Sequence, residues 1–580
     1  MNPTSTATTT TTPVTTDWQR RATELERLYR VGVALSAEQN KDRLVELILL
    51  EAKELTQADG GTLYLAVDDA AGTTTHLRFA IMRNDTLKTA RGGTTGQAVD
   101  MAAVPLFDDD GTPNRKNVAS CAAHEKRSVN VADAYSSPGF DFAGTKRFDD
   151  ATGYRSQSFL TIPMVNNEQR VIGVLQLINA RDDDGRVVAF DARQQEIVEA
   201  LASQAAIALD NQQLLGAQKT LLESFIKLIA NAIDSKSPYT GGHCTRVPII
   251  TEQLARAACD AVDGPFRDFS LSDDEWYELR IAAWLHDCGK VVTPVHVMDK
   301  ATKLETISDR IEAVRARFEI VRRDLEIALL QLPASATDDD RERLRGQQRQ
   351  LDDDMAFLEV ANIGGEWMSP DKQARVKSIA AREVVIGGHR RPLLSADEVD
   401  NLCISRGTLT EAERLIINGH MVQTIKMLEA LPFPRNLRRV PEYAGGHHEK
   451  MDGGGYPKGI YAGDMSVPAR MMAVADVFEA LTAQDRPYKK AKTLSETMKI
   501  MGFMKVDNHL DPVLFDFFIT SGVYRRYAEQ YLPPELIDDV DEAQLLALQP
   551  KAFALPHVDD RRQRQRDFLP AYRAPTADPH

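Results

Sequence analysis

The 580-residue sequence contains little cysteine and no long apolar run. Its five cysteines, at positions 121, 244, 259, 288 and 403, form no Cys-x-x-Cys pair, which is typical of a reduced cytoplasmic protein rather than a disulfide framework. No stretch of about 18 uncharged apolar residues occurs, so we expect no membrane insertion. The threonine-rich start has neither the basic nor the apolar region of a secretory signal, and we expect residues 1–16 to be a disordered leader.

Positive charge is outnumbered as well: the sequence has 70 lysines and arginines against 85 aspartates and glutamates, which gives a net charge of −15. This balance excludes a general nucleic-acid surface, so we expect no polymeric nucleic acid as a partner. The negative charge of a phosphodiester substrate would have to be neutralised locally, by metal ions or a few basic side chains. The length and the 43% hydrophobic content predict several domains with proper cores.

The first third of the chain has the periodicities of an α+β module. Helical patterns are followed by strand-like alternation, with glycine pairs and polar turns between the segments. The predicted helices cover residues 18–35 and 42–55, and the predicted strands cover residues 62–67, 76–82, 158–164 and 171–179. Two helices, antiparallel strands with helical loops and a closing helix are typical of a sensor domain.

Residues 17–212 resemble a GAF domain of the kind that binds cyclic nucleotides. The resemblance rests on residues 128–135, Phe140 and residues 152–163. A loosened Asn-Lys-Phe-Asp-Glu signature follows, with Ala180 in place of the lysine, and it implies ligand roles for Asn179, Phe190, Asp191 and Glu196. The resemblance implies a cyclic nucleotide in this domain, and the alternative is a GAF domain used only for dimerisation.

Residues 192–233 are predicted to form one long helix that connects the two halves of the chain. Leu214, Leu221, Phe225 and Leu228 follow a spacing of about 3.5 residues with polar residues between them. Such a stripe is typical of a parallel dimer seam, so we expect a homodimer.

The second half contains an ordered series of metal-ligand residue types. Residues 447–457 read His-His-Glu-Lys-Met-Asp-Gly-Gly-Gly-Tyr-Pro, and an isolated His-His pair would be typical of a surface loop. Further ligand types before and after it favour a metal site instead. The series comprises His243, His286, Asp287, His420, His447, His448 and Asp476. Mixed imidazole and carboxylate ligands suit Fe, Mn, Zn, Co or Ni rather than Mg or Ca.

These residues predict a centre for phosphodiester chemistry. A carboxylate such as Asp287 can bridge two ions, and two ions can activate water and clamp a phosphodiester for in-line attack. Lys290 follows His286 by one helical turn and suits contact with a phosphate. Arg486 and Lys489 offer two more cations for phosphate oxygens.

A helical insertion interrupts this half at about residues 303–400. Two heptad-like patterns, one from Ile307 to Leu332 and one from Leu344 to Leu358, predict an antiparallel helical hairpin. Its expected role is packing or dimer contact, with a lid over the site as the alternative. The domain resumes with a capping box at Thr410–Glu413, and residues 550–580 are expected to be a mobile tail.

Residues 220–530 resemble the HD-GYP family, metal-dependent phosphodiesterases that hydrolyse cyclic di-GMP. The resemblance rests on residues 286–290, His-Asp-Cys-Gly-Lys, and on the whole of residues 447–457. It implies an all-α HD-type metallophosphohydrolase that uses two divalent ions, Fe or Mn, and yields pGpG and then GMP. Three-metal members have a glutamate where Tyr239 stands, so two ions are expected.

The resemblance also implies individual roles and partners. The implied catalytic residues are His286, Asp287 and Lys290, and the implied substrate-binding residues are Lys290, Gly455, Tyr456, Arg486 and Lys489. The implied partners are a second copy of the chain and GGDEF-type proteins, in the cytoplasm. Two alternatives stay open: a phosphohydrolase acting on another nucleotide, such as a mixed cyclic dinucleotide, and a catalytically weak adaptor that binds partners through the Gly-rich loop.

Overall fold

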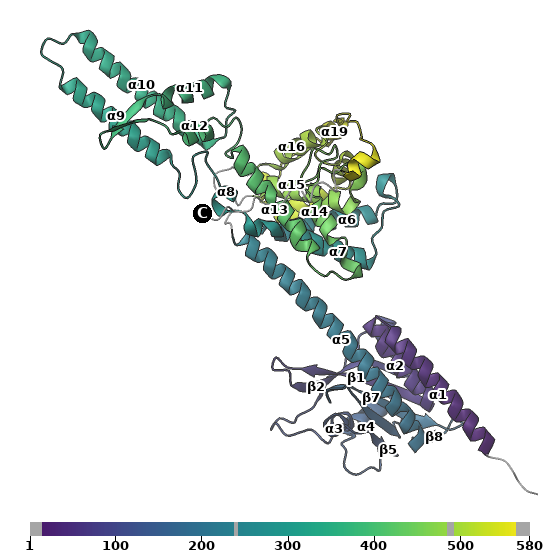
Figure 1. The fold of residues 1–580 in the computed structure, drawn as a ribbon. Coiled ribbons are helices and arrows are strands. Elements are labelled where there is room, and N and C mark those ends of the chain that lie inside the picture. The colour runs from purple at the N-terminus through teal and green to yellow at the C-terminus, as the bar shows by residue number, and fades with distance from the viewer. Residues whose placement is uncertain (1–13, 237–241, 484–491, 564–580) are drawn as a thin grey trace, which may run out of the picture. The chain divides into compact units, whose positions relative to one another are not determined.

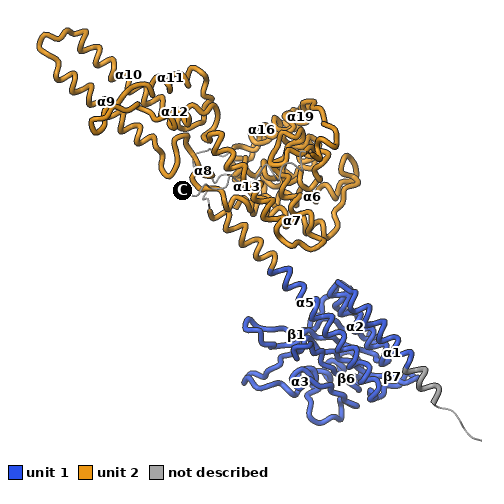
Figure 2. Tube along the Cα trace, in the orientation of Figure 1, with its two compact units in different colours: residues 1–221 blue, residues 222–580 orange. Residues whose placement is uncertain are grey.

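The computed structural model describes residues 14–236, 242–483 and 492–563 (Figure 1). The chain divides into two compact units, residues 1–221 and residues 222–580 (Figure 2). The long helix α5, Ala192–Asp234, begins in the first unit and ends in the second. Its bounds confirm the helix predicted over residues 192–233.

The first unit is built on one antiparallel sheet in the order β3-β2-β1-β7-β6-β5, with β4 paired to β2 and β8 to β7. In the central strands Leu63 lies opposite both Ile81 and Leu175, so three apolar side chains meet on one face. The strands are β1 Ala58–Asp68, β2 Thr74–Asn84, β3 Thr89–Gly92, β4 Val104–Pro105, β5 Val129–Val131, β6 Phe159–Val165, β7 Val171–Arg181 and β8 Val187–Val188.

Helices cover both faces of this sheet. Helices α1 (Val14–Ala37) and α2 (Lys41–Thr56) pack with the first part of α5 on the face that carries Leu63, where Ile48 and Leu201 are fully buried (Figure 1). Helix α3 (Val118–Glu125) packs on the opposite face, beside Tyr64. The short helices α4 (Ala143–Thr152) and η1 (Gly93–Thr95) complete the unit. Side chains of alternating direction along β1 therefore serve two different layers.

The second unit is helical around the apolar helix α15, which is buried on almost every side. Its main helices are α6 His243–Cys259, α7 Asp273–Leu285, α8 Val295–Met298, α13 Glu411–Glu429, α14 Val440–Gly445, α15 Val467–Thr482, α16 Leu494–Val506, α17 Pro512–Thr520, α18 Val523–Tyr531 and α19 Glu542–Ala547. Short 3-10 turns are η2 Gly264–Phe266, η3 Cys288–Val292, η4 Arg435–Leu437, η5 Ala462–Asp464 and η6 Pro534–Leu536. The capping box predicted at Thr410 is present at the start of α13.

The insertion has its own apolar core. Helices α9 (Ile311–Leu330) and α10 (Asp338–Ile363) form the predicted hairpin, in which Phe318 and Leu358 are buried (Figure 1). It continues with α11 Pro370–Ala380, β9 Glu383–Ile386, β10 His389–Pro392 and α12 Ala396–Leu402. The strand pair was not predicted, although Gly387 and Gly388, both with positive φ, provide the two-residue turn that hairpins favour.

The order of an α+β module, a long helix and a mostly helical region with a helical hairpin confirms the predicted fold class, with the strand pair β9–β10 as the exception to an all-α second half. Helix α1 begins at Val14, so the last residues of the predicted leader are helical, while residues 1–13 and 564–580 lie outside the described part. Within the described ranges, no helix combines the length and the apolar character that crossing a membrane requires.

Candidate metal centre

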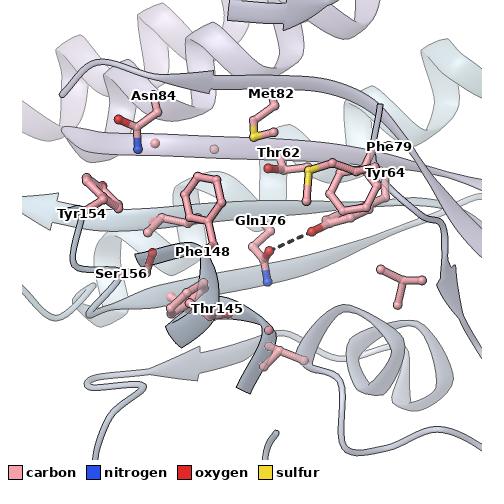
Figure 3. A pocket seen from close by; sticks show the side chains of 18 of the residues that line it. Thr62, Tyr64, Phe79, Met82, Asn84, Thr145, Phe148, Tyr154, Ser156 and Gln176 are labelled. Carbon is pink, nitrogen blue, oxygen red and sulfur yellow. Dashed lines mark hydrogen bonds between the residues drawn. The ribbon is translucent and has the colours of Figure 1, made fainter. Parts of the chain in front are cut away.

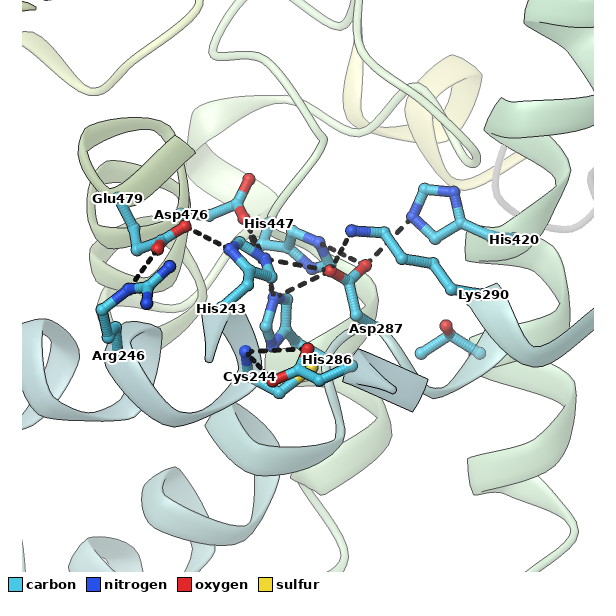
Figure 4. A network of polar contacts seen from close by, with 12 residues as sticks. His243, Cys244, Arg246, His286, Asp287, Lys290, His420, His447, Asp476 and Glu479 are labelled. Carbon is cyan, nitrogen blue, oxygen red and sulfur yellow. Dashed lines mark hydrogen bonds and ion pairs between the residues drawn. The ribbon is translucent and has the colours of Figure 1, made fainter. Parts of the chain in front are cut away.

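Five segments of the second unit place the predicted ligands in one buried cluster (Figure 4). Each of them contributes one or two side chains from a helix end, a helix face or the loop that follows a helix. The ligands are His243 at the start of α6, His286 and Asp287 between α7 and η3, His420 in α13, His447 and His448 after α14, and Asp476 in α15.

The His286–Asp287 pair lies just beyond the end of a helix, whereas we expected it within a helix, with Lys290 one helical turn further on. Helix α7 ends at Leu285, and Asp287 leaves helical geometry at φ −108° and ψ 15°. The turn brings the following η3 against α13. A Cβ on Gly289 would lie 1.9 Å from the carbonyl oxygen of His420, and the Gly289 N–H donates to Thr424 Oγ1 at 2.9 Å. Glycine is therefore what allows Asp287 and His420 to meet.

Three of the histidines are held in the same orientation. The Nδ1 atoms of His286, His420 and His447 lie 2.8, 2.5 and 2.7 Å from the carbonyl oxygen three residues earlier in the chain. A ring that donates its Nδ1 proton to a carbonyl keeps a lone pair on Nε2. In each case that Nε2 atom faces the cluster.

The ligands form two groups that share Asp287. His243 Nε2 lies 3.1 Å from Asp287 Oδ2 and 3.2 Å from Asp476 Oδ1, whereas His420 Nε2 lies 3.2 Å from Asp287 Oδ1. The two carboxylate oxygens of Asp287 thus face different partners. The first ligand group is His243, His286, Asp287 and Asp476, and the second is Asp287, His420, His447 and His448.

The donor set fits two divalent ions. Asp287 Oδ1, His420 Nε2 and His447 Nε2 are buried. The two Nε2 atoms lie 3.2 and 3.9 Å from Asp287 Oδ1, yet none of the three atoms makes a hydrogen bond of good geometry among the described residues. Buried polar atoms are rarely left without a partner, and here all three point into one cluster of nitrogen and oxygen donors. Such mixed donors suit transition-metal ions. The chemistry of the site therefore favours bound metal over a structural polar cluster.

In the second ligand group the charge states suit metal binding. Burial, together with nearby His286, lowers the pKa of His447 to about 4, so its ring is neutral near pH 7. Burial opposes the charge on Asp287, but Lys290 and His286 hold the pKa of that carboxyl well below its usual range. A neutral imidazole and an ionised carboxylate are the forms that ligate metal. In the first group burial opposes protonation of His243 and His286, but Asp287 and Asp476 raise the pKa of both rings, that of His286 to about 9, so a metal ion would displace a proton from each. The Lys290 ammonium lies 2.5 Å from Asp287 Oδ2, inside the cluster rather than at its rim.

The glycine-rich loop lies beside the second ligand group. The Tyr456 ring stacks on His448, with centroids 4.8 Å apart and planes 17° apart. Fully buried Glu449 accepts hydrogen bonds from the N–H groups of Lys458 and Ile460, at 2.7 and 3.1 Å, and so closes the loop on itself. Glu449 was not predicted to have a role.

Gly455 permits this closed loop. A Cβ at Gly455 would lie 2.3 Å from the backbone nitrogen of Lys450, which no side chain tolerates. The structure thus gives Gly455 a role in shaping the loop, while Tyr456 presents the aromatic surface. Arg486, Lys489 and Tyr239, the other predicted contributors, lie outside the described residues.

The buried Glu479 was not predicted from the sequence. It lies one helical turn after Asp476 on α15 and contacts His243 Nδ1, which leaves Nε2 to face the first ligand group. Its other oxygen accepts a hydrogen bond from Arg246 Nε at 2.6 Å. A carboxylate that holds a metal-ligating histidine in this way fixes both the tautomer and the ring orientation. The spacing of three residues from Asp476 was the available signal.

Replacing Glu479 with glutamine should weaken metal binding at the first ligand group by about 10- to 100-fold, because the orientation of His243 is lost. Competition with a chromophoric chelator measures the affinity. The matched control is Glu411→Gln, which changes an exposed glutamate of α13. Equal affinities of Glu479→Gln and wild type would contradict the positioning role.

Comparison with known proteins adds two matches. A GAF domain model matches residues 40–209, and an HD domain model matches residues 393–514, a range that includes His420, His447, His448 and Asp476. The chain combines a GAF domain with an HD domain. The HD model begins after His286, so the first half of the metal centre is assigned by geometry.

The similarity to curated relatives covers only part of each chain. The 3′3′-cGAMP-specific phosphodiesterase 1 of Vibrio cholerae is 39% identical over 116 residues, 20% of this chain and 26% of the relative. The 3′3′-cGAMP-specific phosphodiesterase 3 of that organism is 24% identical over 280 residues, 48% of this chain and 35% of the relative. A cyclic di-GMP phosphodiesterase of Pseudomonas aeruginosa is 28% identical over 173 residues, 30% and 41% of the two chains. The chain thus spans between about a quarter and two fifths of these relatives, and the matches are consistent with a GAF plus HD-GYP architecture.

Of the four residues predicted to contact a GAF ligand, Asn179 and Phe190 are buried inside the fold, whereas Asp191 and Glu196 are exposed. Asn179 is buried, with Oδ1 accepting from the N–H groups of Gln157 and Ser158, and its Nδ2 donating to Tyr154 and to the backbone. Phe190 is part of the main core of the GAF domain. Asp191 Oδ1 accepts from the N–H of Gln194 at the start of α5, and Glu196 is exposed. These contacts give Asn179, Phe190 and Asp191 structural roles, and a ligand role for the four residues stays a prediction.

Proposed function

We propose that the chain is a metal-dependent phosphodiesterase that hydrolyses cyclic di-GMP and is regulated by its GAF domain. The observation that supports this most is the shared carboxylate of Asp287, whose two oxygens face two separate groups of buried nitrogen and oxygen ligands. An adaptor that binds partners through its loop would not require such an arrangement. The names of the curated relatives support the same class of reaction.

The protein's own groups suit this reaction. Two bound divalent ions, with Fe or Mn proposed, would supply activated water and neutralise phosphate charge. Asp287 keeps the two ligand groups at a fixed separation, and the partly buried Lys290 ammonium stabilises negative charge that develops on the phosphate. Tyr456, stacked on His448, positions the substrate against the second ligand group. Opening the ring once yields pGpG, and a second cut yields GMP.

A second candidate substrate is 3′3′-cGAMP. Two of the relatives described above are named as specific for this mixed cyclic dinucleotide, which supports it as the alternative. Both substrates have two phosphodiester bonds in one ring, so the metal centre alone does not separate them. The choice between them depends on contacts to the bases.

Hydrolysis assays separate the two substrates. The full chain is loaded anaerobically with Fe(II) or Mn(II) and given each dinucleotide, and the products are resolved by chromatography. We expect conversion of cyclic di-GMP to pGpG at a rate at least about tenfold above that of 3′3′-cGAMP, which is a difference of about 1.4 kcal/mol. The reverse preference would establish the second candidate. Two bound ions without turnover of either would contradict the phosphodiesterase proposal.

We also propose a homodimer formed along α5. Leu214, Leu221 and Leu228 recur every seven residues and are 61%, 57% and 62% exposed, which is unusual for leucines in so regular a row. A second α5 would bury this stripe. Sedimentation should show a dimer for wild type and for the control Gln213→Glu, and a monomer for the double variant Leu221→Glu/Leu228→Glu. A dimeric double variant would rule out this seam.

The GGDEF-type partner and the cytoplasmic location stay predictions.

A further inference from the structure

The GAF domain contains a cavity of about 240 Å³ between the sheet and the helices α3 and α4 (Figure 3). Thr62 and Tyr64 of β1 and Gln176 of β7 form its floor, and Phe148 of α4 covers it from the other side. We call it the GAF cavity. None of the four signature residues lines it. Its size is slightly below the range of about 300–1,000 Å³ that is common for small-molecule sites, so it suits a small ligand.

Aromatic side chains make up a quarter of the residues that line the GAF cavity. Tyr64 and Phe79 pack with centroids 4.7 Å apart, and Phe142 and Phe159 pack at 5.4 Å. Ring edges and faces of this kind favour a flat ligand with its own π-system. The six aromatic residues of the lining are Tyr64, Phe79, Phe142, Phe148, Tyr154 and Phe159.

The lining offers no cation to a phosphate. Among its residues only Arg83 and Asp141 carry a charge. The Arg83 guanidinium is occupied, since it contacts Glu46 at 2.5 Å and donates to the carbonyl oxygens of Met82 and Arg91 at 2.9 and 2.8 Å. Asp141 is negative and would repel a second anion. Burying a phosphate here would leave its charge without a partner, which is strongly unfavourable.

Among the polar groups on the sheet side of the lining, the Thr62 hydroxyl is available to a ligand. Tyr64 donates to Gln176 Oε1 at 3.0 Å, and Gln176 Nε2 donates to Thr161, so these groups already have partners. The Thr62 side chain is only 4% exposed and lines the cavity, yet no hydrogen bond engages its hydroxyl within the described residues. A hydroxyl that faces the cavity without a partner suits a ligand that supplies one.

We propose that the GAF cavity binds an uncharged small molecule that carries an aromatic ring, hydrogen-bonded to Thr62, and that it excludes cyclic nucleotides. This replaces the cyclic nucleotide that the signature implied for this domain. The proposal concerns a regulatory ligand and stands independently of the activity of the HD domain.

Ligand-detected saturation-transfer NMR on the full chain tests this. The probes are indole and adenosine, which are uncharged rings, and cyclic AMP, which adds an anionic phosphate to the adenosine framework. We expect millimolar indole or adenosine to bind, and cyclic AMP to bind at least about tenfold more weakly than adenosine because its phosphate finds no cation. Binding of neither uncharged probe would overturn the proposal.

Two variants locate the binding. Thr62→Val removes the hydroxyl at nearly constant shape. It should lower the affinity for the probe by about fivefold, which is the effect of one hydrogen bond. Phe148→Ala removes a ring that is 38% exposed, so the fold should tolerate the change. This variant should lower the affinity for the probe by a similar factor. Unchanged binding in both variants would place the probe elsewhere and overturn the proposal. So would cyclic AMP binding that is lost in Phe148→Ala.

Discussion

Replacing Asp287 with alanine should abolish hydrolysis and remove bound metal from both ligand groups. The residue is 1% exposed, and each of its oxygens faces a different group, so one substitution takes a ligand from both. Losing the several kcal/mol that a metal ion contributes to charge stabilisation corresponds to a rate lower by about 1,000-fold or more. Metal analysis by mass spectrometry and a product assay measure the two effects.

The control for this experiment is Asp268→Ala, which changes an aspartate that is 86% exposed beside η2. It should retain metal and activity. Asp287→Asn preserves the shape of the side chain but removes its charge, and it should also lose metal, because the charge state of the ligand matters. Two ions retained in Asp287→Ala would show that this carboxylate does not join the two groups.

Replacing Gly289 with alanine should destabilise the HD domain by roughly 3 kcal/mol, at the upper end for overpacking of a core. The added carbon would overlap the carbonyl oxygen of His420 and lie 2.5 Å from the nitrogen of Thr424, both backbone atoms that cannot rotate away. Helix α13 would have to move from η3, and His420 would move with it. Urea unfolding followed by the fluorescence of Trp276 and Trp284 on α7 measures the stability.

Gly419→Ala is a matched control on the same helix. The position directly precedes His420, and an added Cβ meets no atom within 4 Å. Alanine favours a helix over glycine by about 1 kcal/mol, so this variant should be slightly more stable than wild type. Similar unfolding curves for the two alanine variants would contradict the close contact between η3 and α13.

Much of this architecture was predictable because it depends on local patterns. Periodicity located the central strands, the long α5 and the hairpin of α9 and α10, and the Thr410 capping box located the start of α13. The seven predicted metal ligands lie together in the structure. They could be predicted because their residue types and their order along the chain form a specific series. Short motifs whose residue types are fixed by their chemistry can be recognised in a single sequence.

The remainder depends on tertiary contacts that no local pattern reveals. Glu479 is one acidic residue among 85 until the fold brings it to His243 Nδ1. Glu449 acts on backbone amides nine and eleven residues further along the chain. The structural role of Asn179 was also hidden, because only the fold shows that its amide oxygen accepts from the backbone N–H groups of Gln157 and Ser158.

The most direct test of the two-metal centre is the number of ions bound per folded chain. The purified full chain is loaded anaerobically with Mn(II) or Fe(II), passed through a desalting column, and analysed for metal and protein in the same sample. The two ligand groups joined by Asp287 predict two ions per chain. One ion, or none, would contradict a shared-carboxylate centre and with it the proposed route to phosphodiester hydrolysis.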